Sequence, residues 1–222
     1  MTTVGIIGGT GPQGRGLGYR FARGGYDVIL GSRQEDRAVA AAEDLGGRLG
    51  TQAAVRGMEN DKAAQTADLA VLAVPFTGHD ELVESLRDSL AGKTVISCVN
   101  PLGFDRHGPY GLDLEGSSAA ERAAALLPES DLVAAFHHLS AVTLLGDSEQ
   151  LAEEDVLVCG DSIEAKNIVI QLASTITGKD GIDAGRLRLA RQLEPLTAIL
   201  ISINKRYKVH SGVAVVGMPT GR

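Results

Sequence analysis

The chain has 222 residues, of which 44% are hydrophobic and 22% are charged. These proportions are typical of a folded globular protein, and they exclude a disordered or collagen-like chain. The formal net charge of −7 at pH 7 leaves no basic surplus for a nucleic-acid backbone or an anionic membrane surface. We therefore expect neither a nucleic acid nor a membrane among the partners of this protein.

The cysteines and the apolar runs limit the cellular setting. Cys98 and Cys159 lack the short spacing of a zinc site, a redox pair or a disulfide framework. No apolar stretch reaches the ~20 residues that a membrane span requires, and the residues after Met1 include no basic leader. The sequence therefore predicts a cytoplasmic protein without a metal centre.

Short apolar, β-branched runs alternate with helical patterns through the first half of the chain. Five such alternations predict an α/β fold with a Rossmann-type, doubly wound parallel sheet. The expected strands are 3–8, 26–30, 53–56, 68–74 and 94–99, and the expected helices are 14–23, 34–45, 59–67 and 80–90.

The second half begins with a segment from Gly103 to Gly116 that is rich in Gly, Pro and Asp and has no periodicity. Such composition predicts an irregular loop. Beyond it we expect a small C-terminal α/β extension, with the active site in the cleft between a domain over residues 1–130 and a second over 131–222. Its expected strands are 131–136 and 155–159, and the expected helices of the second half are 117–127, 162–177 and about 186–205.

A glycine-rich turn follows the first strand and matches G-x-G-x-x-G. In such a turn the first glycine makes the bend, the second lets the backbone approach a pyrophosphate, and the third lets helix and strand pack closely. Because the match stands between a strand and a helix, it predicts a dinucleotide site rather than a turn without a ligand. Its residues are Gly9, Thr10, Gly11, Pro12, Gln13 and Gly14.

The end of the second strand indicates which dinucleotide binds. An NAD site usually places a carboxylate there for the ribose 2′-hydroxyl, whereas this chain has Ser32 and Arg33, with Arg37 one helical turn further. Two guanidinium groups at i and i+4 and one hydroxyl suit a 2′-phosphate, which predicts NADP. For Arg37 an alternative stays open, namely surface ion pairs with Glu35, Asp36 or Glu43.

These motifs, together with the strings LAVPF, NPL, AFHHLSA, VCGD and DAGRL, resemble the NADPH-dependent coenzyme F420 reductases, also called F420H2:NADP oxidoreductases. The resemblance covers nearly the whole chain. It implies an NADP-binding Rossmann domain, a small C-terminal domain that completes the deazaflavin cleft, and a homo-oligomer (dimer or tetramer). It also implies reversible hydride transfer between NADP(H) and the 8-hydroxy-5-deazaflavin F420.

The resemblance further implies roles for individual residues. Thr10 to Gln13 would line the pyrophosphate, and Ser32, Arg33 and Arg37 would bind the 2′-phosphate. The nicotinamide half and the deazaflavin would meet a further set, made of Val74, Pro75, His137, Leu139 and Ala141, with Asp183, Ala184 and Gly185 in a loop near the same pocket.

The residues themselves are compatible with this chemistry, since direct hydride transfer between two stacked rings requires no metal cluster and no nucleophile motif. His137 is the candidate for stabilising charge on the reduced deazaflavin, although a structural role is equally compatible with the sequence. Because adjacent strand residues point in opposite directions, we expect at most one of His137 and His138 to face the cleft. Two alternatives stay open: a non-catalytic NADP(H)-sensing regulator, and an NADPH-dependent reductase of a flavin, a ferric complex or a small imine.

Overall fold

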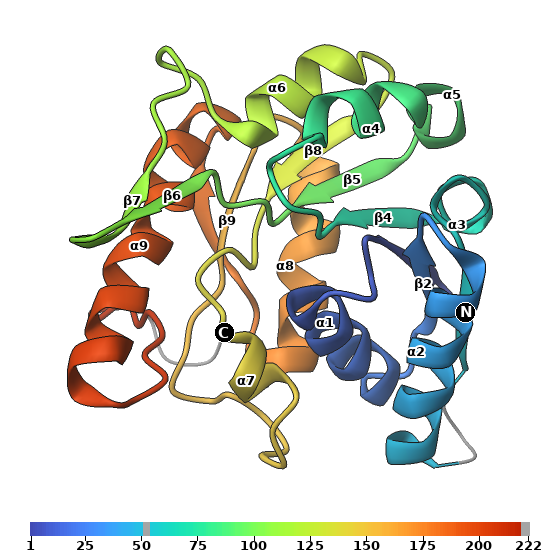
Figure 1. Cartoon of the computed structure of the whole chain (residues 1–222), viewed down its shortest axis with the longest axis horizontal. Coiled ribbons are helices and arrows are strands. Elements are labelled where there is room, and N and C mark those ends of the chain that lie inside the picture. Colours follow the sequence, from blue (N-terminus) through green and yellow to red (C-terminus); the bar gives the residue numbers. More distant parts are fainter. Residues whose placement is uncertain (51–53, 219–222) are drawn as a thin grey trace.

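The computed structural model describes residues 1–50 and 54–218. Within these residues an eight-stranded sheet has the order β10-β9-β8-β5-β4-β1-β2-β3, with helices on both faces (Figure 1). Six neighbouring strands, from β3 through β2, β1, β4 and β5 to β8, are parallel. The Rossmann-type fold predicted from the alternating pattern is therefore confirmed.

The predicted elements of the first half are present, with ends that shift by up to four residues. The predicted helix 80–90 is divided at Leu86 into α4 and α5, and the predicted strand 53–56 starts at position 53, outside the described residues. The elements are β1 Thr3–Ile7, α1 Pro12–Arg23, β2 Asp27–Ser32, α2 Glu35–Leu49, β3 Val55–Glu59, α3 Asn60–Thr66, β4 Leu69–Leu72, α4 His79–Ser85, α5 Arg87–Leu90 and β5 Thr94–Ser97.

The second half joins the same sheet. The strand β8, which begins at Asp131, pairs with β5 in the middle of the sheet, so the two halves share one hydrogen-bonded layer. Its elements are β6 Leu102–Asp105, β7 Gly108–Gly111, α6 Ala119–Leu126, β8 Asp131–Ala134, α7 Ala141–Leu144, β9 Leu157–Gly160, α8 Ile163–Thr177, β10 Ile182–Gly185, a 3₁₀ turn Leu187–Leu189 and α9 Ala190–Tyr207.

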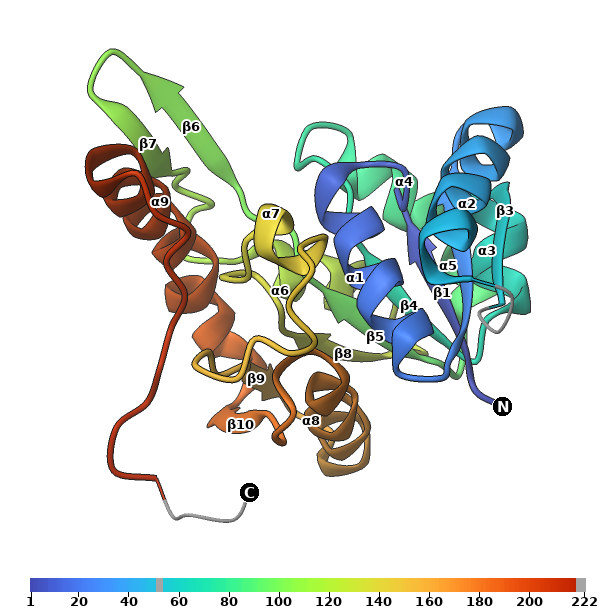
Figure 2. The same cartoon turned by 90° about the horizontal axis from the view of Figure 1, so that it is seen from below.

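The prediction of an irregular loop over residues 103–116 was wrong for its first part. The strands β6 and β7 form an antiparallel hairpin with Leu102 opposite Gly111 and Asp105 opposite Gly108. The hairpin rests on α9, since a Cβ at Gly111 would lie 2.7 Å from Cβ of Pro195. A tertiary contact therefore stabilises strands whose composition is typical of a loop. Figure 2 shows the hairpin and α9 side by side at the end of the molecule opposite to α2 and β3.

The sheet is not parallel throughout. Strand β9 runs antiparallel to β8, with Val133 opposite Gly160, and β10 runs parallel to β9. The chain between β8 and β9 contains only the one-turn helix α7, and a parallel pair would need a crossover element long enough to bring the chain back across the sheet. Strands β9 and β10 therefore begin at the edge of the sheet where the first six strands end.

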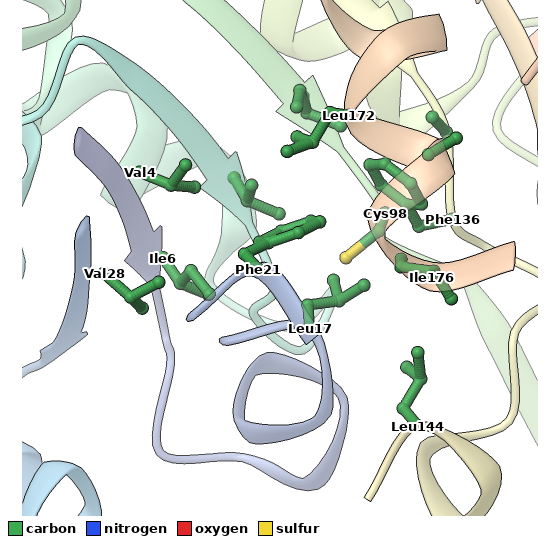
Figure 3. Close-up of a cluster of buried hydrophobic side chains, with 14 of the residues drawn as sticks. Val4, Ile6, Leu17, Phe21, Val28, Cys98, Phe136, Leu144, Leu172 and Ile176 are labelled. Atoms are coloured by element: carbon green, nitrogen blue, oxygen red, sulfur yellow. The ribbon is translucent and has the colours of Figure 1, made fainter. Parts of the chain in front are cut away.

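The described core lies on both faces of the sheet. Side chains of β1 alternate between the two faces, so that Ile6 belongs to a cluster with side chains of α1, α2 and α8, and Ile7 belongs to a second cluster with side chains of α3 to α6 and α9. Figure 3 shows the first of these clusters, in which Phe21 of α1 contacts Phe136 edge to face at 5.7 Å between ring centroids. No helix in the described part of the chain is both long enough and apolar enough to cross a membrane.

Candidate active site

The glycine-rich turn has the close packing that its motif predicts. The Gly9 amide donates to the carbonyl oxygens of Ile6 (3.0 Å) and Gly31 (2.8 Å), which ties the turn to β1 and β2. A Cβ at Gly14 would lie 2.7 Å from Cα of Gly9. Helix α1 has Gly11 at its N-cap, no side-chain cap and no acidic residue in its first turn. Its first amides therefore face the cleft with a dipole that favours an anion.

Two residues beside the glycine-rich turn, Gly8 and Asn60, were not predicted as site residues. Gly8 has a left-handed φ of 76°, and its amide donates to Oδ1 of the buried Asn60 at 3.1 Å. A side chain at Gly8 would be strained at this φ and would also meet Cγ1 of Val74 at 2.6 Å. The paired glycines at 8 and 9 were a usable signal, whereas the position of Asn60 depends on how α3 packs.

A cavity of about 720 Å³ lies along this turn, and we name it the dinucleotide cavity. Ser32, Arg33 and Arg37, the residues predicted to bind a 2′-phosphate, all line it. No ion pair among the described residues includes either arginine, and Glu35 pairs with Lys62 (3.5 Å) instead. The two guanidinium groups are therefore available to a phosphate. Its lining is Gly8, Thr10, Gly11, Ser32, Arg33, Gln34, Arg37, Asn60, Ala73, Val74, Pro75, Thr77, Gly78 and Leu82.

A second cavity of about 550 Å³ continues from the first, and we name it the ring cavity. Both cavities share Gly11, Ala73, Val74 and Pro75, so the end of β4 and the glycine turn form their common wall. The predicted residues Pro12, Gln13, His137, Leu139 and Ala141 line the ring cavity. The remaining lining residues are Cys98, Asn100, His138, Ser140, Val142, Thr197, Leu200, Ile201, Asn204, His210 and Ser211.

Three side chains hold the backbone at the floor of the ring cavity. Gln13 Nε2 donates to the Phe136 carbonyl oxygen at 3.1 Å. The carbonyl oxygen of His137 accepts from Asn100 Nδ2 at 3.0 Å and from Thr197 Oγ1 at 2.9 Å. These donors come from α1, from the loop after β5 and from α9. The 136–137 backbone is therefore fixed from both halves of the chain.

The two adjacent histidines differ from expectation, because both line the ring cavity. Strand β8 ends at Ala134, and Phe136 adopts a left-handed φ of 66°, so the strand alternation no longer applies at 137 and 138. Burial, followed by the neighbouring His138, lowers the pKa of His137 to about 3, which keeps its imidazole neutral. His138 Nε2 bonds the carbonyl oxygen of Asp155 at 2.7 Å.

The far wall of the ring cavity was not predicted. Thr197, Leu200, Ile201 and Asn204 have the i, i+3, i+4, i+7 spacing of one face of α9, and this spacing was a readable signal for a buried face. The segment after α9 supplies His210 and Ser211. Ser211 is held there because its amide (2.6 Å) and hydroxyl (2.7 Å) both donate to Asn204 Oδ1. Nothing in the composition of that segment indicated this contact.

Asp183, Ala184 and Gly185 line neither of these two cavities. They lie in β10, the outermost strand on that side of the sheet, which β9 separates from β8. Asp183 accepts two bonds from Nζ of the buried Lys166 (2.8 and 2.7 Å). This placement differs from the expected loop near the deazaflavin pocket, and the position of β10 as the outermost strand is its physical reason.

The donor sets suit a phosphorylated dinucleotide and a second flat ligand. Main-chain amides at α1 and the Ser32, Arg33 and Arg37 side chains match phosphate groups, and the wall common to both cavities is apolar. Within the described residues no group of three or more His, Cys, Asp or Glu side chains is placed to hold a metal ion.

Comparisons with known proteins agree with this geometry. A family model described as NADP oxidoreductase coenzyme F420-dependent matches residues 3–101. The chain is 38% identical over 225 residues to the F420-dependent NADP reductase of Methanothermobacter thermautotrophicus, which covers 97% of this chain and 95% of that protein. It is 36% identical over 211 residues to the F420-dependent NADP reductase of Methanocaldococcus jannaschii, which covers 92% and 93%.

A solved structure described as a putative F420-dependent NADP-reductase from an Arthrobacter species has a TM-score of 0.80 and 24% sequence identity, and the match covers 97% of this chain and 100% of that chain. At that identity the likeness supports the fold alone. The curated relatives exceed a third identity over nearly their whole length and that of this chain. The protein therefore belongs to the family of F420-dependent NADP reductases.

Proposed function

We propose that this protein is an NADP-dependent oxidoreductase that transfers a hydride reversibly between NADP(H) and the deazaflavin coenzyme F420. The observation that carries the proposal is the continuity of the dinucleotide cavity with the ring cavity at Gly11, Ala73, Val74 and Pro75. A dinucleotide anchored at its phosphates can extend its nicotinamide to this shared wall. A second ring then has the ring cavity available beside it.

The dinucleotide is proposed to bind along the predicted residues. Gly9 to Gly14 would hold the pyrophosphate at the start of α1, and Ser32, Arg33 and Arg37 would hold the 2′-phosphate. Val74, Pro75 and Ala141 would flank the nicotinamide. His137 and Leu139 would contact the deazaflavin, and residues 131–222 would thereby complete the cleft that residues 1–130 begin.

The bound NADPH would supply the hydride, so the protein's own residues need only orient and shield the rings. The small and apolar side chains of Ala73, Val74 and Pro75 allow close stacking and exclude water. Rings held about 3–3.5 Å apart react without the entropic cost of bringing them together. His137, which is neutral, offers a hydrogen bond to a polar ring edge rather than a positive charge.

The direct test mixes purified protein with NADPH and F420 and follows the visible absorbance of the deazaflavin. We expect the absorbance to fall, and to recover when NADP+ is added to reduced F420. Parallel reactions replace F420 with FMN, a ferric complex or a small imine. Turnover of one of these without turnover of F420 would refute the proposed acceptor, and tight NADPH binding without any turnover would favour the regulator.

We also infer a homo-oligomer of two or four copies and a cytoplasmic location. Large apolar side chains are exposed on the hairpin and α9, with Phe104 at 68%, Ile199 at 58% and Tyr207 at 66%. A second copy of the chain would cover them. Light scattering should give at least a dimer, and the double substitution Phe104→Glu with Ile199→Glu should reduce the mass, whereas Ile163→Glu on α8 should not.

The state of the cysteines supports the proposed cytoplasmic location. Cys98 and Cys159 are unpaired thiols, as is usual in a reducing compartment.

A further inference from the structure

Helix α1 contains a buried arginine that bonds only to backbone carbonyl groups. Arg20 has 0% exposure. Its Nε donates to the carbonyl oxygen of Leu144 at 2.7 Å. Its terminal nitrogens donate to the carbonyl oxygens of Thr143 (2.7 Å), Ser148 (2.7 Å) and Glu149 (2.9 Å), with a longer contact to Gly146 (3.5 Å). One guanidinium group therefore holds most of residues 143–149.

This arrangement requires arginine specifically. A guanidinium has five N–H donors in a fixed plane, which matches carbonyl groups arriving from several directions, whereas an ammonium has three donors at a single point. No ion pair among the described residues includes Arg20, so carbonyl dipoles, together with the nearby carboxyl group of Glu154, compensate its buried charge. A buried charge whose partners are removed is strongly destabilised. Loss of the guanidinium group would therefore remove the partner of all these carbonyl groups at once.

The segment that Arg20 holds, residues 141–149, includes α7 and is named the α7 segment. A helix of one turn does not persist in water without tertiary contacts. A Cβ at Gly16 would lie 2.7 Å from Cβ of the buried Leu144, so α7 packs directly on the glycine face of α1. The position of the α7 segment is therefore set mainly by α1, with one further bond from the Arg48 guanidinium of α2 to the Leu145 carbonyl oxygen at 2.7 Å.

The α7 segment forms part of the ring cavity. Ala141 and Val142 line that cavity beside Ser140, the N-cap of α7. Gln13, Gly16 and Arg20 lie near one face of α1, at spacings of three and four residues. The first turn of this face bonds the Phe136 carbonyl oxygen, the middle packs on Leu144, and Arg20 in the last turn bonds the carbonyl oxygens of Ser148 and Glu149.

We propose that Arg20 is a positioning residue for the second substrate: it fixes the α7 segment against α1 and so sets the width of the ring cavity relative to the dinucleotide cavity. Arg20 touches neither cavity itself. The proposal rests on the proposed function in that F420 is the ligand of the ring cavity. It assigns to the dinucleotide-binding helix a role in binding the other ring.

The test compares Arg20→Gln and Arg20→Lys with the wild type. In Arg20→Gln we expect the KM for F420 to rise about tenfold or more, because F420 would then have to order the loosened α7 segment when it binds, while the dissociation constant of NADPH stays within about twofold. Arg20→Lys keeps the charge but has fewer donors, so its KM for F420 should lie between those of the wild type and of Arg20→Gln. Arg23→Gln is the matched control, because exposed Arg23 makes one longer bond to the Ser148 carbonyl oxygen at 3.3 Å.

Hydrogen exchange supplies a readout that does not depend on turnover. Amides of residues 141–149 should exchange faster in both Arg20 variants than in wild type or Arg23→Gln, while amides of β1 and β4 stay protected. Unchanged exchange in this segment, or equal losses of NADPH and F420 binding, would overturn the proposal. If Arg20→Gln does not fold, Arg20→Lys alone decides between these outcomes.

The two levels of inference fail in different ways. If wild-type protein reduces no F420, the proposed function is wrong, and the exchange experiment still reports whether Arg20 fixes the α7 segment. If the wild type is active and the KM for F420 does not change in either Arg20 variant, the role of Arg20 is wrong and the proposed function stands.

Discussion

We expect selectivity for a phosphorylated adenosine to depend on the side chains of Arg33 and Arg37. Arg33 and Arg37 are exposed, line the dinucleotide cavity and make no ion pair with any described residue. Ser32 is buried beside them, and its hydroxyl accepts a bond from the Gln34 amide at 3.2 Å. The hydroxyl hydrogen therefore remains available to a phosphate oxygen.

Replacement of Arg33 tests this assignment. Arg33→Ala should weaken NADPH binding by ~1.5–3 kcal/mol, the range for a hydrogen bond to a charged group, and should leave NADH binding nearly unchanged. Calorimetry with both dinucleotides measures the difference. Arg56→Ala, at an exposed position of β3 outside both cavities, is the matched control. Equal losses for NADPH and NADH would mean that Arg33 supports the fold rather than the phosphate.

At the scale of elements, the sequence predicts best the structure of those segments whose spatial neighbours are also close in the chain. The turn, β1 and α1 are contiguous, so the motif alone predicts their geometry. The hairpin β6–β7 was missed because it depends on Pro195, which lies far along the chain. The direction of β9 was not readable either, because short apolar strands look alike in both orientations. The placement of Asp183 to Gly185 was not readable because it depends on the strand order, in which β9 separates β10 from β8.

Two helical glycines, one in the glycine-rich turn and one outside it, should respond in opposite ways to substitution by alanine. Gly14→Ala should destabilise the protein by ~1–3 kcal/mol and weaken NADP binding, because its Cβ would lie 2.7 Å from backbone Cα of Gly9. Gly46→Ala in α2 meets no atom within 4 Å and should stabilise by ~0.5–1 kcal/mol through the unfolded chain. Urea unfolding measures both. A neutral Gly14→Ala would show that the turn shifts without cost.

At the scale of the whole molecule, the candidate site is assembled from distant segments that meet at one edge of the sheet. The ends of β1, β2, β4, β5 and β8 reach that edge because these strands are parallel, which is why their residues could be predicted as site residues. Helix α9 and the segment after it close the site from the other half of the chain. Their position depends on contacts that span the molecule, among them the bond between Thr197 and the His137 carbonyl.

Glu194 of α9 makes one such contact, with the start of α6. We expect this contact to make the stability of the molecule depend on pH. This residue of α9 is 2% exposed, and its carboxylate accepts from the amides of Ala119 (2.9 Å) and Ala120 (3.0 Å) at the start of α6. Burial raises the pKa of Glu194 to about 7 from its ordinary value of 4.5, although the two amides act in the opposite direction. The native state therefore binds this proton more tightly than the unfolded chain.

Because the native pKa is the higher one, the stabilising contribution is complete below pH 4.5 and is lost as the pH rises through 7. The free energy of unfolding of the wild type, measured relative to Glu194→Gln, should fall by up to about 3 kcal/mol across this window, since each pKa unit corresponds to about 1.4 kcal/mol. Urea titrations at several pH values measure it, with the exposed Glu164→Gln as control. If this difference in the free energy of unfolding stays constant or grows with pH, the pKa of Glu194 is not raised in the native state. The two α6 amides would then stabilise the charged carboxylate more than burial destabilises it.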